Sequence, residues 1–149
     1  MRILVLTRNN PVEISYVINR IRNYFYNDSL KFFCDSPQMI ALDVEHKSNI
    51  PYTFAFFPAI KTYEANKEDI SNMVDVFITV GTTDVDSKYW YDIIVGIDDY
   101  NISNYKTFDT SIYSCEIFTT KDAEIKFNNI DELLIFLNKI VRINIKNDI

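Results

Sequence analysis

The chain of 149 residues is 48% hydrophobic, which suits one folded domain with a sizeable core and excludes a disordered chain. Its 15 Lys and Arg against 21 Asp and Glu give a formal net charge of −6, a balance that argues against direct binding to nucleic acid. No apolar run approaches the roughly 18 residues needed to cross a membrane, so we expect a cytoplasmic protein of a cell or of a host cell.

The chain begins with a predicted buried strand and an amphipathic helix. Residues Arg2–Thr7 form an apolar run without alternation, typical of a strand covered on both faces. Asn10 then suits a helix N-cap, Pro11 the first helical position, and Glu13 the acid of a capping box. Apolar side chains follow at helical spacing, and these are Ile14, Val17, Ile18, Ile21 and Phe25.

The next segments predict two strands and two short helices. Leu30–Cys34 favours a second strand, followed by a helix that Ser36 caps and that runs to about Val44. Tyr52–Phe57 lies between two prolines and predicts a third, edge strand, because proline removes ladder hydrogen bonds at both borders. Lys67–Met73 predicts a short helix. Its core residues are expected to be Ile70, Met73 and Val74.

Two central runs, Val76–Val80 and Ile93–Val95, predict buried strands that end at Gly81 and Gly96, the only glycines in the chain. We expect these strands to lie side by side and to run in the same direction. The segment between them is short for a crossover helix, so Ser87–Tyr91 is expected to supply a turn or two.

The C-terminal part predicts extended segments and a final helix. Ser111–Thr119 is rich in strand formers, and the sequence leaves open whether Ala123–Phe127 pairs with it at an antiparallel edge or continues the sheet. Asn129 is a helix cap with Glu132 as its capping-box acid, and residues 143–149 are expected to fray. The expected buried stripe is Ile130, Leu133, Leu134, Leu137, Ile140 and Val141.

Strands and helices thus alternate along most of the chain, with no linker or repeat to divide it. This order predicts one α/β domain over residues 1–149, with three layers and a mainly parallel, Rossmann-like sheet covered by helices on both faces. Oligomeric state is left open by the sequence.

Ligands of open α/β sheets collect beyond the carboxyl ends of the strands. The residues that follow the predicted strands are therefore the candidate ligand-binding residues. They are Thr7, Arg8, Asn9, Asn10, Gly81, Thr82, Thr83, Asp84, Gly96, Asp98 and Asp99.

Neither the GxGxxG fingerprint nor the GxxxxGK[ST] phosphate loop is present. Arg8 and Asn10 could add donors for a phosphate at the first helix N-terminus, where Glu13 would compete, and Arg8 could equally be a solvated surface charge. Four acids near strand ends could bind Mg²⁺ or exchange protons, or could simply form turns, and no metal is assigned to them. These acids are Asp84, Asp86, Asp98 and Asp99.

No catalytic residue or cofactor is assigned from the sequence. Cys34 lies near the expected site but has no neighbouring base, and His46 lies in a polar stretch away from the strand ends. The second cysteine, Cys115, is too distant in sequence to form a zinc motif with Cys34, so reduced, buried thiols are expected.

Residues 77–86, FITVGTTDVD, resemble the FVTVGTT opening of small glycosyltransferase subunits that bind a UDP-sugar. In that family such a strand and glycine turn face the nucleotide sugar. The resemblance covers ten residues, lies in mid-chain and is followed by no matching diphosphate loop, so no residue role is transferred from it.

We therefore expect a small α/β protein that binds a ligand of the nucleotide or nucleotide-sugar class at the carboxyl ends of its strands. The alternative is a non-catalytic protein-interaction module, such as an inhibitor encoded by a virus or phage, that acts through an acidic surface rich in tyrosine. No membrane association is expected in either case.

Overall fold

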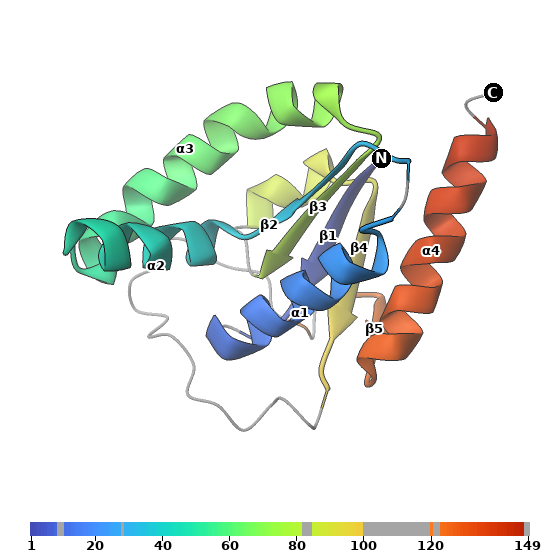
Figure 1. Cartoon of the computed structure of the whole chain (residues 1–149), viewed down its shortest axis with the longest axis horizontal. Helices are drawn as coiled ribbons and strands as arrows, with labels where there is room; N and C mark the ends of the chain where they lie inside the picture. Colours follow the sequence, from blue (N-terminus) through green and yellow to red (C-terminus); the bar gives the residue numbers. More distant parts are fainter. Residues whose placement is uncertain (9–10, 28, 82–84, 100–119, 121–122, 148–149) are drawn as a thin grey trace.

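A computed structural model describes residues 1–8, 11–27, 29–81, 85–99, 120 and 123–147. Five parallel strands form one sheet in the order β2-β3-β1-β4-β5 (Figure 1). The strands are β1 (Arg2–Leu6), β2 (Phe32–Asp35), β3 (Val76–Gly81), β4 (Ile93–Ile97) and β5 (Ile125–Phe127). The helices are α1 (Pro11–Tyr24), α2 (Pro37–Ser48), α3 (Tyr52–Met73) and α4 (Ile130–Asn147), with a 3₁₀ helix, η1 (Val85–Trp90), between β3 and β4.

The central strand β1 shows how the sheet is buried on both faces. Ile3 and Val5 point into a core built with α1 and α4, whereas Leu4 and Leu6 point into a second core that includes Tyr63 of α3. All four β1 side chains are fully buried, which explains the apolar run without alternation. The predicted three-layer α/β fold with a parallel sheet is confirmed.

The first and last helices follow their sequence patterns. The predicted apolar residues of α1 are all buried, and in α4 all but the partly buried Ile140 are. Asn129 Oδ1 accepts a hydrogen bond from the Asp131 amide at 2.7 Å, which confirms the predicted cap. The helix continues to Asn147, into the segment predicted to fray.

The predicted edge strand at residues 52–57 is wrong, because these residues form the first turns of the 22-residue helix α3. Ala55 and Ala59 lie one helical turn apart and pack on Ala41 of α2. Pro58 lies inside the helix and not at a strand border. The predicted helix near residue 70 is the end of α3, and there Met73 is 65% exposed rather than part of the core.

One prediction about the sheet needs correction, and one alternative that the sequence left open is decided. β3 and β4 run in the same direction, but they are not neighbours, because β1 lies between them and pairs with both. Of the two alternatives for residues 123–127, the described strands show continuation of the sheet, since β5 pairs in parallel with β4 and no antiparallel edge is present among them. The short η1 replaces a full crossover helix, as the segment length predicts, and residues 111–119 lie outside the described part of the chain.

Candidate functional site

The carboxyl ends of all five parallel strands lie at one edge of the sheet. At this edge the adjacent strands β1 and β3 lead to opposite faces, because α1 packs in one core and the residues around η1 pack in the other. The Thr7 amide donates a hydrogen bond to the Gly81 carbonyl at 3.1 Å, which joins the two exits. Such a divergence of connections is where open α/β sheets place their ligands.

Arg8 and Asp98 connect the exits of β1 and β4. Arg8 Nε lies 3.1 Å from Asp98 Oδ1, and Nη2 lies 3.4 Å from Oδ2, so the guanidinium faces both carboxylate oxygens. The two side chains are 40% and 36% exposed, so both can still be reached from solvent. Sequence reasoning named both residues, and the fold brings them together.

Glu13 lies in the first turn of α1 and is fully buried. Burial raises the pKa of its carboxyl from 4.5 to about 7. The backbone hydrogen bond and the positive charge of Arg8 lower this pKa, whereas the negative charges of Asp98 and Asp99 raise it. A carboxyl with such a pKa can gain or lose a proton near neutral pH. The sequence presented Glu13 as a helix-capping acid and as a competitor of an anion at the helix N-terminus, not as a buried group.

Asp99 is 5% exposed and points into the protein. Its Oδ2 accepts a hydrogen bond from the Ile130 amide at 3.2 Å, so it holds the N-terminus of α4 against the end of β4. Thr7 is 1% exposed, and its hydroxyl donates to the Arg8 carbonyl at 2.8 Å. Both residues are at the predicted site, but these bonds give their side chains a structural role.

A small hollow of about 140 Å³ opens beside Asp98, between the ends of β4 and β5. Its walls carry one acid, one amine, one hydroxyl and one amide in addition to backbone. The lining residues are Gly96, Ile97, Asp98, Thr120, Lys126 and Asn128. Lys126, Thr120 and Asn128 were not predicted, because nothing in the sequence indicates that β5 lies beside β4.

The two glycines serve different purposes. Gly81 ends β3 with a φ of +129°, and a Cβ there would lie 2.5 Å from Oε1 of the buried Gln38. Ser36 Oγ donates to the same oxygen at 2.8 Å. Gly96 instead lies within β4, where a Cβ would lie 3.1 Å from Ala123 Cβ. Because glycine has no Cβ, Ala123 can pack closely against β4 at this position.

Several predicted site residues lie outside the described part of the chain, namely Asn9, Asn10, Thr82, Thr83 and Asp84. Among the described residues, no three His, Cys, Asp or Glu side chains are grouped closely enough to hold a metal ion. Cys34 is buried and unpaired by a disulfide, and burial raises the pKa of its thiol, which disfavours the nucleophilic thiolate. No described helix is long and apolar enough to span a membrane.

Comparison of the chain with models of known protein families, with curated proteins and with solved structures gives no match. The interpretation of this edge therefore depends on its own geometry and charge.

Proposed function

We propose that the protein binds a small polar ligand of the nucleotide or nucleotide-sugar class at the carboxyl edge of its sheet. The observation that carries this proposal is the half-exposed Arg8–Asp98 pair beside the polar hollow at the ends of β4 and β5. A carboxylate at such a strand end accepts hydrogen bonds from the hydroxyls of a ribose or sugar. Arg8 and Lys126 supply cationic donors that suit a phosphate or further hydroxyls.

The distribution of charge suggests how such a ligand would lie. Asp99 already occupies the N-terminus of α4, and Glu13 lies in the first turn of α1, so neither helix end offers a clear anion site. The ligand's hydroxyl-bearing sugar therefore suits the neighbourhood of Asp98, and its phosphates suit the side of the hollow where Lys126 stands.

A thermal-shift series tests the proposal with uridine, UMP, UDP and UDP-glucose and with the corresponding adenine compounds. A ligand present at about 100 times its Kd stabilises the folded protein by ~2.7 kcal/mol, which raises the melting temperature measurably. Asp98→Asn should remove most of the shift, because the amide cannot replace the carboxylate as a charged acceptor.

Asp43→Asn is the matched control, since Asp43 is an exposed residue of α2 that forms an ion pair with Lys47, one helical turn later. It should keep the full shift. The proposal is overturned if none of the compounds raises the melting temperature, or if Asp98→Asn and Asp43→Asn respond alike.

A second proposal, protein interaction without catalysis, is favoured by a different surface. A hollow of about 460 Å³ lies at η1 and the first residues of β4, bordered by Tyr89, which is 83% exposed, and Ile125, which is 40% exposed. Asp92 and Glu124 line it together with Lys88, so a partner with apolar and basic side chains would fit. This proposal would be favoured over the first if the wild type captures a protein partner in a pull-down, Tyr89→Ser does not, and no nucleotide raises the melting temperature.

A further inference from the structure

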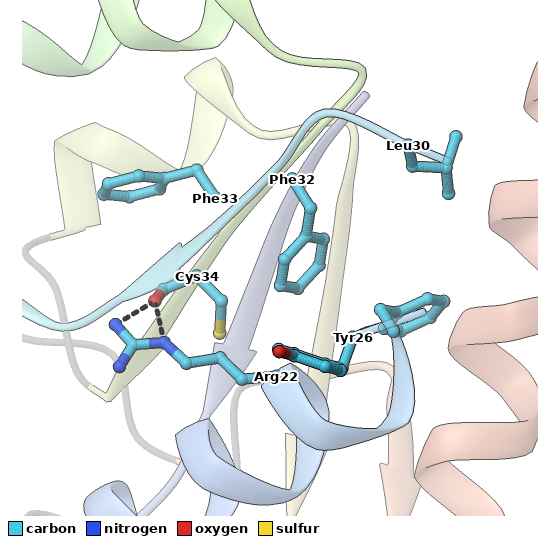
Figure 2. A pocket seen from close by; sticks show the side chains of 7 residues that line it. Arg22, Tyr26, Leu30, Phe32, Phe33 and Cys34 are labelled. Atoms are coloured by element: carbon cyan, nitrogen blue, oxygen red, sulfur yellow. Dashed lines mark hydrogen bonds between the residues drawn. The ribbon is translucent and has the colours of Figure 1, made fainter. Parts of the chain in front are cut away.

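The outer edge of β2 borders a third hollow, lined by none of the residues of the proposed site. β2 pairs with β3 on one side only among the described strands. The hollow has a volume of about 400 Å³ and lies between the end of α1 and this free edge (Figure 2). Its size is within the range of pockets that hold small organic ligands.

The wall of this hollow is aromatic. Phe25 and Phe32 stack with their ring centroids 5.3 Å apart and their planes at 29°. Tyr26 is 82% exposed at the rim, and Leu30 adds an aliphatic surface (Figure 2). A flat or aliphatic ligand body could cover these side chains and remove apolar surface from water.

Arg22 supplies the positive charge in the hollow. Its Nε and Nη2 donate to the Cys34 carbonyl at 3.0 and 2.7 Å, which fixes the orientation of the guanidinium (Figure 2). Nη2 also forms an ion pair with Asp35 Oδ2 at 3.7 Å, so the guanidinium already faces one carboxylate of the chain. With its side chain half exposed, Arg22 presents a fixed, accessible donor to the hollow.

The same contact argues against a partner strand at this edge. The Lys31 carbonyl accepts bonds from the amides of Asp75 and Val76, so it faces β3. In a parallel ladder alternate residues face opposite sides, and the Cys34 carbonyl therefore faces outward. Because Arg22 already occupies that carbonyl, an added strand would have to displace the guanidinium.

We propose that the hollow at the β2 edge binds a small amphiphilic carboxylate. The apolar body of the ligand lies on Tyr26 and Phe32, with the buried Phe25 behind them, and its carboxylate accepts hydrogen bonds from Arg22. An anion matches this hollow because a fixed, half-exposed guanidinium lies beside an aromatic wall, and a ligand carboxylate would compete there with the 3.7 Å ion pair to Asp35.

Three probes of similar shape and different charge test this proposal on the full chain, namely phenylpropanoate, phenylpropanol and phenylpropylamine. Binding is followed by NMR at the Phe32 and Cys34 amides and at the Arg22 Nε–H. The carboxylate should bind at least about tenfold more tightly than the alcohol, and the amine should bind more weakly than either. Equal affinities for acid and alcohol, or no perturbation at these groups with millimolar acid, would overturn the proposal.

Variants separate the charge from the apolar wall. Arg22→Gln should reduce the affinity for the acid to that for the alcohol, whereas Arg142→Gln, a change at an exposed position of α4, should leave the preference intact. Tyr26→Ser, at a highly exposed position, should weaken the acid and the alcohol by similar factors. If Arg22→Gln does not fold, Arg22→Lys is the second variant, because it retains the charge but loses the planar set of guanidinium donors. An unchanged affinity for the acid in Arg22→Lys would contradict the proposed geometry.

Discussion

Glu13 shows how one buried group connects folding to the proposed site. Its carboxyl lies at the start of α1, near the charges of Arg8, Asp98 and Asp99, and its pKa is raised to about 7 by burial. The capping pattern identified the position correctly as part of the first helical turn. It could not reveal the burial or the nearby charges, because these depend on the tertiary fold, which brings Asp98 close from 85 residues later in the chain.

Glu13→Gln should change how stability depends on pH. In the wild type the folded state holds a proton that the unfolded chain releases above pH 4.5, so stability falls between pH 4.5 and about 7 and is level above that range. The total loss from this group is about 3 kcal/mol at high pH. Urea unfolding should therefore show the stability of the Gln variant rising relative to that of the wild type from pH 4.5 to about 7, with a constant difference above that range.

Glu124→Gln, at an exposed position, is the control and should leave the pH profile unchanged. A constant difference between Glu13→Gln and the wild type over the whole range would contradict the assignment of the raised pKa.

Gly81 has both a backbone and a packing reason to lack a side chain. Gly81→Ala should cost about 2–3 kcal/mol in the free energy of unfolding, because φ is +129° and a Cβ would lie 2.5 Å from Gln38 Oε1. Adding Gln38→Ala should recover the part due to the contact and leave the part due to the backbone. Chemical denaturation of the two variants checks this, and a double variant no more stable than Gly81→Ala would place the whole effect in the backbone.

At the scale of elements, the sequence was most informative where a helix has one polar face. The patterns of α1 and α4 predicted their buried residues, since a stripe at helical spacing has few alternative structures. The run YTFAFF in α3 lacks such a face, and its aromatic residues are equally typical of a strand. The YTFAFF run packs as a helix against α2, and the run alone does not contain the sequence of that partner helix.

The contact between α2 and α3 depends on small residues. Ala59→Leu should destabilise the protein by about 1–3 kcal/mol, because Ala59 is 8% exposed and packs with Ala41 and Ala55. Ala65→Leu, at an exposed position of the same helix, should be near neutral and controls for the change in residue type. Urea unfolding of both variants measures the difference, and equal stabilities would show that the contact between α2 and α3 accommodates a larger side chain without cost.

For the whole molecule, the sequence predicted the class of fold but not the strand order. Continuous apolar runs indicate strands buried on both faces, and alternation with helices indicates a parallel sheet. Nothing local in Val76–Gly81 or Ile93–Ile97 indicates that β1 inserts between them. The candidate site was predicted to the same degree: the strand ends were identified, whereas the neighbours contributed by β5 and by the start of α2 were missed.

Hydrogen exchange should reflect this arrangement. The amides of Leu4 and Val5 lie in the central strand, whereas those of Ile125–Phe127 belong to a three-residue edge strand. We expect the β1 amides to exchange about 100-fold more slowly or better, equal to ~2.7 kcal/mol or more in opening free energy. Similar rates in β1 and β5 would mean that the sheet opens only as a unit.

The central place of β1 has a consequence for biosynthesis. β1 leaves the ribosome before the other described strands, and its two ladder partners, β3 and β4, begin only at Val76 and Ile93. A nascent chain that stops short of them exposes a strand of five residues, four of them apolar, with both hydrogen-bonding edges open. Co-translational folding of this sheet must therefore wait until the residues of β4 have been synthesised, and during that interval chaperone capture of β1 competes with self-association.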